Sequence, residues 1–217
     1  MAEFPLSAAV LVGGRSSRMG SDKATLRLLP GGPTLMELVL AALSEVSDDL
    51  MVVGSDRTDL LPLLRPRARI VTDRYPGAGP LGGIASAVAA AACPRTLVVA
   101  CDMPFLSPTV LRLLARWAPE ADVVIPELKG ESRQGGKTVF QTLHAIYGVG
   151  ALPVMERALE HGNNQVIGWF SEVDVQPVNE TAIRNLDPNL LGFTNVNTPE
   201  ALSRVRTGLE QGTLSLP

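Results

Sequence analysis

The sequence at residues 8–14 is Ala8-Ala9-Val10-Leu11-Val12-Gly13-Gly14. A short apolar run that stops at two glycines is typical of a buried strand that leads into a loop. Similar runs occur at 50–54, 69–72, 96–101 and 122–126. Between the first two runs, apolar residues recur at the spacing of one helical face: Leu35, Leu38, Val39, Ala42, Leu43 and Val46. This alternation predicts an α/β fold with a Rossmann-like, open, mostly parallel sheet and helices on both of its faces.

Helix start signals occur twice in the second half of the chain, at Ser107-Pro108 and at Thr198-Pro199. A hydroxyl side chain followed by proline is typical of a helix cap and first turn. We predict helices that run from these points to Trp117 and to about Leu209.

The stretch 127–138 has no apolar periodicity and is predicted to be a surface loop, followed by a strand near 139–147. The 217 residues suffice for one α/β domain, and no linker or internal repeat divides them. We therefore expect a single domain.

The composition excludes several classes of protein. The formal charge is −3, whereas a broad nucleic-acid-binding surface needs a clustered basic excess. The two cysteines, Cys93 and Cys101, form no CxxC pair and fit a reduced intracellular protein. No apolar run is long enough for a signal peptide or a membrane span. We expect a cytoplasmic protein with no nucleic-acid or membrane partner.

The loop after the first strand-like run combines glycines with cations. Gly13 and Gly14 let backbone N–H groups approach a phosphate chain, while Arg18 and Lys23 can neutralise its charge. The loop matches neither the GxGxxG dinucleotide fingerprint nor the GxxxxGK[ST] Walker A pattern. An ordinary strand-to-helix turn is the alternative, but two cations beside a glycine turn favour an anion site.

Two carboxylates follow predicted strands. Asp102 comes directly after 96–101 and Asp73 after 69–72, at the carboxyl ends where open α/β sheets bind their ligands. Asp102 is suited to hold Mg²⁺ against a triphosphate, because this cation takes oxygen ligands and keeps several from substrate and water. A helix-capping role is the alternative, but Ser107 is the better cap. We expect the two strands to be neighbours, with both carboxylates at one edge of the sheet.

Other polar positions carry weaker signals. The glycine- and proline-rich turn after Asp73 can hold a base or an acceptor phosphate before it feeds an alanine-rich helix. Asn195 and Asn197 alternate along a predicted short strand, and an asparagine just before a helix is more often structural than a metal ligand. His144 and His161 stand alone, so covalent nucleophilic catalysis has little support.

Four segments, in this order along the chain, resemble motifs of the molybdenum cofactor guanylyltransferases, a branch of the sugar-nucleotidyltransferase-like α/β enzymes. They are Leu11-Val12-Gly13-Gly14 with Arg18-Met19-Gly20-Ser21-Asp22-Lys23, Gly79-Pro80-Leu81-Gly82-Gly83, Cys101-Asp102-Met103-Pro104-Phe105-Leu106, and Asn195-Val196-Asn197-Thr198-Pro199-Glu200. The segment Gln141-Thr142-Leu143-His144-Ala145-Ile146-Tyr147 also resembles a family strand that faces the acceptor pocket. The chain departs from the family pattern in three places, with Val12 where alanine is usual, Gly54 where asparagine is common, and Asn163-Asn164-Gln165 in place of a more basic stretch.

The resemblance implies an enzyme that uses GTP and Mg²⁺ to attach GMP to the terminal phosphate of molybdopterin. It assigns nucleotide binding to Leu11, Val12, Gly13, Gly14, Lys23, Asp73 and Asp102. It assigns catalysis to Lys23, Arg18 and Asp102, and the metal to Asp102. It assigns acceptor binding to Pro80, Leu81, Gly82, His144, Asn195 and Asn197.

The resemblance also implies a division of labour within the single domain. The nucleotide-binding half is expected at about 7–126 and the acceptor-binding half at about 127–210. The implied protein partners are a molybdenum insertion enzyme and molybdoenzyme chaperones.

Two other functions remain open at this point. A CTP-dependent pterin or sugar-phosphate transferase would use the same fold, and nucleotide preference separates it from a guanylyltransferase. A nucleotide-binding maturation factor without turnover is a different class of protein, and the presence of both Lys23 and Asp102 argues against it. The implied chemistry is direct in-line attack on the α-phosphorus, which needs positioning and charge neutralisation rather than a nucleophilic side chain.

Overall fold

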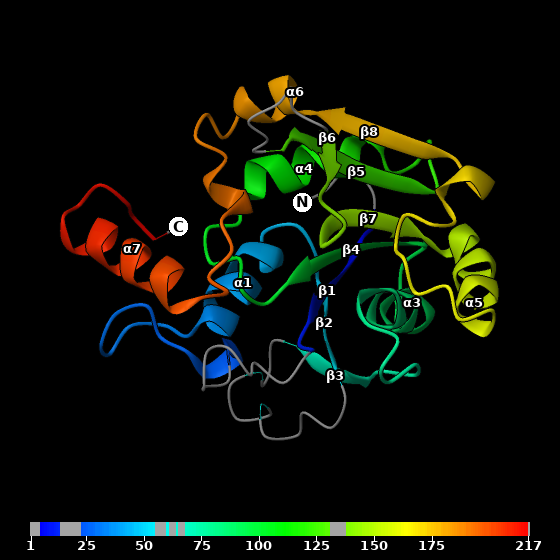
Figure 1. Ribbon diagram of the computed structural model, residues 1–217, viewed down its shortest axis with the longest axis horizontal. Helices are drawn as coiled ribbons and strands as arrows, with labels where there is room; N and C mark the ends of the chain where they lie inside the picture. Colours follow the sequence, from blue (N-terminus) through cyan, green and yellow to red (C-terminus); the bar gives the residue numbers. More distant parts are fainter. Residues whose placement is uncertain are drawn as a thin grey trace.

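The predicted strands, together with one at 175–179 that the sequence does not predict, form one eight-stranded sheet (Figure 1). The computed structural model describes residues 5–13, 23–54, 60, 64, 68–130 and 138–216. The strands are β1 (Ser7–Leu11), β2 (Asp49–Gly54), β3 (Arg69–Thr72), β4 (Arg95–Ala100), β5 (Val123–Lys129), β6 (Thr138–Phe140), β7 (His144–Gly148) and β8 (Val175–Asn179). Their order is β3-β2-β1-β4-β7-β5-β6, and β8 pairs with β5 outside this path.

The sheet is open and mostly parallel, as predicted. Strands β1 to β4 pair in parallel, and β8 pairs in parallel with β5. Strand β7 is antiparallel to both of its neighbours, β4 and β5, and β6 is antiparallel to β5. Four of the apolar runs are therefore buried strands of one sheet, and the run 69–72 is its half-exposed edge strand β3. The predicted fold class is confirmed.

Two local predictions differ from the structure. The single strand predicted at 139–147 is two strands, β6 and β7, with a turn between them. The loop predicted at 127–138 begins later, because β5 continues to Lys129, and residues 131–137 lie outside the described residues. Strand β7 pairs with a distant partner, since His144 is aligned with Val99 in β4, whereas β6 pairs with the nearby end of β5, where Lys129 is aligned with Thr138. Local patterns do not reveal such long-range pairing.

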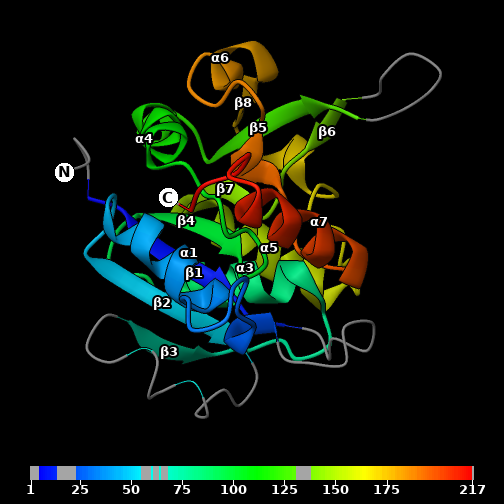
Figure 2. The same cartoon turned by 90° about the vertical axis from the view of Figure 1, so that its left-hand side faces the viewer.

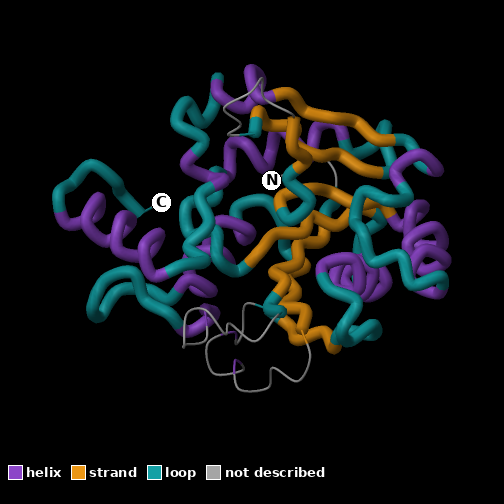
Figure 3. Tube along the Cα trace, viewed as in Figure 1, coloured by secondary structure: helices purple, strands orange, loops and turns teal. Residues whose placement is uncertain are grey.

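Helices cover both faces of the sheet (Figures 1 and 3). On one face lie α1 (Leu35–Ser44), α4 (Pro108–Trp117) and α6 (Glu180–Arg184), and on the other lie α3 (Pro80–Ala90) and α5 (Leu152–Glu160). Alternate residues of β1 point to the two sides, with Val10 in the core beneath α1 and Ala9 in the core beneath α3. The sheet is thus the middle layer of three.

The last helix, α7 (Pro199–Glu210), forms an outer layer beside α1 (Figure 2). Val205 packs with Leu28 and Leu38 in a third, smaller core. Short 3-10 helices complete the described secondary structure: η1 (Lys23–Thr25), η3 (Val149–Ala151), η4 (Phe170–Glu172) and η5 (Leu191–Phe193). No helix in the described ranges is long and apolar enough to cross a membrane.

Both predicted helix starts are confirmed by their caps. The Val110 N–H donates to the hydroxyl of Ser107 at 3.5 Å, and the Ala201 N–H donates to that of Thr198 at 3.1 Å. Such caps contribute about 1 kcal/mol each. Because Ser107 caps α4, the nearby Asp102 is not needed for that role.

The chain reverses the direction of sheet growth between β3 and β4. Strands β2 and β3 lie on one side of β1, and β4 lies on the other side. The carboxyl ends of all four strands meet at one edge of the sheet, and open α/β sheets bind ligands at such a switch point.

Candidate active site

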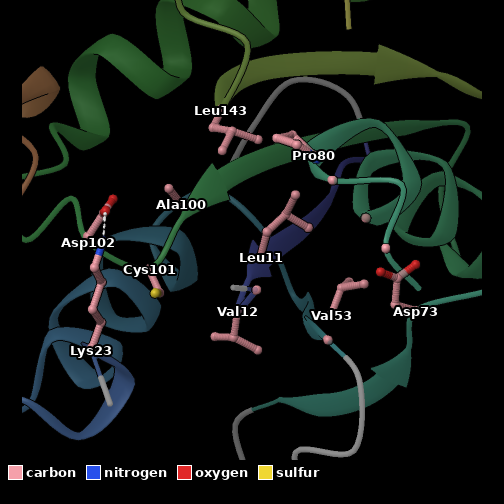
Figure 4. Close-up of a pocket in the computed structure, with 15 residues that line it drawn as sticks. Leu11, Val12, Lys23, Val53, Asp73, Pro80, Ala100, Cys101, Asp102 and Leu143 are labelled. Atoms are coloured by element: carbon pink, nitrogen blue, oxygen red, sulfur yellow. Dashed lines mark hydrogen bonds and ion pairs between the residues drawn. The ribbon is translucent and has the colours of Figure 1, made fainter. Parts of the chain in front are cut away.

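A cavity of about 440 Å³ opens at the switch point between β1 and β4 (Figure 4). The ends of β1, β2 and β4 form its floor, and the turn before α3 forms a wall. It is lined by Leu11, Val12, Gly13, Lys23, Val53, Gly54, Asp73, Gly77, Gly79, Pro80, Gly83, Ala100, Cys101, Asp102 and Leu143. Its size is that of a small-molecule site. It brings together seven residues that the sequence predicts at the site: Leu11, Val12, Gly13, Lys23, Asp73, Pro80 and Asp102.

An ion pair between Lys23 and Asp102 lies at one end of the cavity (Figure 4). The Lys23 ammonium donates to Asp102 Oδ2 at 2.9 Å, and the two side chains are 24% and 15% exposed. The other oxygen, Asp102 Oδ1, is buried and has no hydrogen-bond partner among the described residues. This end of the cavity therefore offers a lysine cation and a carboxylate oxygen that is free to accept.

Asp73 lies at the opposite end of the cavity (Figure 4). Its Oδ1 accepts from the Tyr75 N–H at 2.9 Å and from the Ser86 hydroxyl at 3.1 Å. The prediction that Asp73 and Asp102 end neighbouring strands is wrong, because β1 and β2 separate β3 from β4. The two carboxylates share the edge of the sheet, but the width of two strands lies between them.

The turn between β3 and α3 takes its shape from glycine. Gly77 and Gly79 have φ values of +90° and +69°, a conformation that residues with a Cβ atom rarely adopt. Gly79 directly precedes α3, and Pro80 is its first residue, where the missing N–H of proline costs nothing. All three residues line the cavity.

The start of α3 packs closely against its neighbours. A Cβ on Gly82 would lie 2.8 Å from the Tyr75 backbone oxygen, and one on Gly83 would lie 3.0 Å from Leu11 Cδ1. Leu81 is fully buried in the core beneath α3. Of the predicted acceptor residues in this segment, only Pro80 thus lines the cavity, because the helix begins earlier than the sequence indicates and turns Leu81 and Gly82 inward.

The segment with Asn195 and Asn197 passes beside Asp102. The Val196 N–H donates to the Asp102 carbonyl at 2.8 Å, and Val196 is buried while both asparagines are exposed. The short strand predicted here is wrong, because residues 194–197 have no strand pairing in the structure. The backbone of this segment is thus bonded to that of Asp102, whereas neither asparagine lines the cavity.

The chain is similar in sequence to known nucleotide-using enzymes. A family model described as "MobA-like NTP transferase domain" matches residues 8–175. The chain belongs to this family. A "probable molybdenum cofactor guanylyltransferase" of Pelotomaculum thermopropionicum is 35% identical over 93% of this chain and 92% of the relative. A "molybdenum cofactor guanylyltransferase" of Desulfosudis oleivorans is 30% identical over 95% of this chain and 96% of the relative.

A solved structure supports the same assignment. The crystal structure of the molybdopterin-guanine dinucleotide biosynthesis protein A of Archaeoglobus fulgidus has a TM-score of 0.75 with this chain. The two are 28% identical, and the match covers 94% of this chain and 99% of the other. The resemblance that the sequence motifs indicate is thereby confirmed, and with it the class of enzyme, the nucleotidyltransferases.

The predicted acceptor residue His144 does not line the cavity. Its side chain is fully buried, stacks on Phe193 with a centroid distance of 4.3 Å, and has no hydrogen bond to either ring nitrogen from the described residues. Burial lowers the pKa of His144 to about 3, so the imidazole is neutral at pH 7. The neighbouring Leu143 lines the cavity instead. The side chain of His144 thus belongs to the core rather than to an acceptor surface.

Two predicted residues of the MobA-like glycine loop, Gly14 and Arg18, lie outside the described residues. Among the other lining residues, Val53 and Gly54 follow from the parallel pairing of β2 with β1, and Gly54 is the position where the family commonly has asparagine. Leu143 lies in the segment that resembles a family strand facing the acceptor pocket, and the Ala100 N–H donates to its carbonyl at 3.3 Å beside the cavity.

Proposed function

We propose that the protein transfers GMP from GTP to the terminal phosphate of molybdopterin and releases pyrophosphate. Membership in the MobA-like NTP transferase family supports nucleotidyl transfer, and the names of the relatives support this nucleotide and this acceptor. The observation that carries the proposal is the two-ended cavity, with Lys23 and Asp102 at one end and Asp73 at the other. A nucleoside triphosphate has the same polarity, with a charged phosphate end and a nucleoside end that offers hydrogen-bond donors.

The residues at the charged end fit Mg²⁺. Asp102 Oδ1 is a buried carboxylate oxygen without a partner among the described residues, and oxygen is the donor that this cation prefers. No group of three or more His, Cys, Asp or Glu in the described ranges forms a cage made of protein alone. This fits a cation that takes most of its ligands from phosphate oxygens and water. When bound, Mg²⁺ neutralises charge on the triphosphate and on the departing pyrophosphate.

The side chains of the cavity supply alignment and charge. Lys23 holds an ammonium group where the phosphates would lie, and Gly13 leaves its backbone open to the guanine and ribose. A terminal phosphate oxygen of molybdopterin forms a bond to the α-phosphorus of GTP, and the bond to the β-phosphate oxygen breaks with its electrons leaving on pyrophosphate. Such an in-line displacement gains most of its rate from positioning and electrostatic stabilisation.

The acceptor is proposed to lie on the side of Asn195 and Asn197. The backbone hydrogen bond between Val196 and Asp102 supports this, because it connects the segment of these two exposed asparagines to the residue at the charged end of the cavity. In this proposal residues 7–126 bind the nucleotide and residues 127–210 bind the acceptor. The reaction takes place in the cytoplasm, next to a molybdenum insertion enzyme and the chaperones that receive the product.

Nucleotide preference tests the proposal. We expect kcat/KM with a molybdopterin acceptor to favour GTP over CTP by at least about tenfold, or roughly 1.4 kcal/mol. A Cβ at Gly13 would meet nothing within 4 Å and would therefore project into open space at the cavity. Gly13→Ala should crowd the larger guanine more than cytosine and narrow the preference.

The measurement is pyrophosphate release with each nucleotide and the same acceptor. A preference for CTP would identify the cytidylyl alternative. Release with neither nucleotide, from a folded protein that binds GTP, would identify a maturation factor without turnover.

A further inference from the structure

A buried hydroxyl behind the cavity connects three parts of the nucleotide turn. Ser86 lies on α3 and is fully buried, and it does not line the cavity. Its Oγ accepts from the Arg74 N–H at 2.8 Å and lies 3.1 Å from Asp73 Oδ1 and 2.8 Å from the Gly82 carbonyl. A serine in a helix commonly donates its one hydroxyl proton to the carbonyl four residues earlier, and here Ser86 shares that proton between the Gly82 carbonyl and Asp73 Oδ1. The hydrogen bonds of Ser86 with Asp73 and Arg74 are additional to this common helical pattern.

The contacts leave Asp73 with one anchored oxygen and one open oxygen. Oδ1 accepts from the Tyr75 N–H and from Ser86, whereas no hydrogen bond reaches Oδ2 from the residues that the structure describes. A carboxylate oxygen can accept two or more hydrogen bonds, so Oδ2 has its full capacity left for a ligand. The rotamer of Asp73 therefore depends on what holds Oδ1.

We propose that Ser86 is a positioning residue that presents Asp73 Oδ2 to a hydrogen-bond donor of the nucleoside. Ser86 also fixes the backbone of the turn at Arg74, so that the same hydroxyl sets the wall of the cavity and the direction of its carboxylate. This inference rests on the proposed function in one respect, which is that the ligand of the cavity is a nucleotide. It assigns to Ser86 a part in nucleoside selection without any contact to the ligand.

The position of Asp73 predicts that the loss of Ser86 affects binding of the nucleoside but not binding of the phosphates. Asp73 lies at the opposite end of the cavity from Lys23 and Asp102, so the loss of Ser86 should weaken binding of the nucleoside and leave binding of phosphates alone. We expect Ser86→Ala to raise the Kd for GTP with Mg²⁺ by about five- to tenfold. The Kd for pyrophosphate with Mg²⁺ should stay within about twofold of the wild type.

A double-mutant cycle separates positioning from a general loss of structure. Asp73→Asn keeps an oxygen for Tyr75 and Ser86 but turns a donor toward the cavity, and we expect it to raise the Kd for GTP by about tenfold or more. Ser86→Ala in the Asp73→Asn background should then add little, because there is no carboxylate left to present. Simple multiplication of the two single effects would overturn the inference.

The control is Thr96→Val, which removes another buried hydroxyl. Thr96 is 1% exposed on β4, and its hydroxyl has no hydrogen-bond partner in the described part of the chain. This variant should leave both affinities unchanged. Ser86→Ala removes one atom and adds none, so we expect a folded protein by circular dichroism, and Asp73→Asn tests the same presentation without a change in α3.

The experiment is isothermal titration calorimetry with GTP and with pyrophosphate, on wild type and the four variants. An unchanged Kd for GTP in Ser86→Ala, or an equal loss for pyrophosphate, would overturn the positioning role while the proposed function stands. A wild-type protein that binds pyrophosphate but not GTP would overturn the proposed function, and this inference with it.

Discussion

The two oxygens of the Asp102 carboxylate have different surroundings, and this predicts the effect of a substitution. Oδ2 accepts from Lys23, whereas Oδ1 is buried without a partner among the described residues. We expect Asp102→Asn to keep the fold, because the amide has the same shape. Turnover should fall by at least about a hundredfold, since one lost electrostatic contact to a transition state costs about 3 kcal/mol.

Pyrophosphate release at saturating Mg²⁺ measures this loss, and thermal unfolding checks the fold. Asp48→Asn is the matched control, because Asp48 is exposed and does not line the cavity. Near-normal turnover of Asp102→Asn would show that Asp102 does not bind the Mg²⁺ ion.

His144 predicts a pH dependence of stability. Burial lowers its pKa to about 3, whereas an imidazole in the unfolded chain titrates near about 6.5. Between these values the unfolded state binds a proton that the folded state does not, so the free energy of unfolding decreases as the pH falls below about 6.5. The contribution of one such group is at most about 1.4 kcal/mol per pH unit. We expect His144→Phe, which keeps a ring against Phe193, to remove this part of the slope.

Urea unfolding between pH 7 and pH 5 measures the slope. His161→Gln is the control, because His161 is exposed and its loss tests the removal of a surface histidine. An unchanged slope in His144→Phe would mean that His144 is not held neutral in the fold.

At the scale of elements, the first turn of α3 packs closely against neighbouring residues because Gly82 and Gly83 have no side chains. A Cβ on Gly82 would lie 2.8 Å from a backbone oxygen, which cannot move aside as a flexible side chain can. We expect Gly82→Ala to destabilise the protein by about 1–3 kcal/mol, the usual cost of overpacking, although alanine favours a helix.

Gly13→Ala is the matched comparison, because its methyl group meets nothing within 4 Å. This variant should unfold at nearly the wild-type urea concentration while its nucleotide binding changes. If Gly82→Ala were as stable as Gly13→Ala, the close approach of α3 to the Tyr75 backbone would not hold in solution.

Elements whose signals are local are predicted well from the sequence. The apolar run at 8–12 corresponds to β1 at Ser7–Leu11, and the run at 69–72 is β3. The capping serine and threonine place α4 and α7 correctly, because a cap and its helix are adjacent in the chain. The same holds for the charged end of the site, where Lys23 and Asp102 follow from strand ends and loop chemistry.

Elements that depend on distant partners are not predicted. The insertion of β7 between β4 and β5 depends on pairing across many residues, so a single strand at 139–147 looks equally good locally. The separation of Asp73 from Asp102 depends on where each crossover places its strand. Ser86 is also missed, since a serine within an alanine-rich helix gives no sign that a carboxylate lies behind it.

At the scale of the whole molecule, the two proposed halves share one sheet. Strand β7, which belongs to residues 127–210, lies between β4, which belongs to residues 7–126, and β5 (Val123–Lys129), which crosses the boundary between the two halves. Neither half can separate without breaking a row of backbone hydrogen bonds. We expect a single cooperative unfolding transition, as is usual for one domain.

Two probes in urea check this expectation. Trp169 is 1% exposed and reports on the core beneath α3 and α5, and Trp117→Phe removes the signal of the exposed Trp117. The fluorescence of Trp169 and the far-UV circular dichroism should have the same midpoint. A fluorescence midpoint at clearly lower urea would show that the second half unfolds first.

The position of β7 in the sheet also affects how the chain can fold during translation. A ribosome delivers the N-terminal strands first, so β1 to β4 can assemble before residues 144–148 exist. Until then β4 has one open edge, which is a template for pairing with other nascent chains. This edge of β4 is therefore covered only when translation supplies β7, which is aligned with β4 but follows it in the chain only from residue 144.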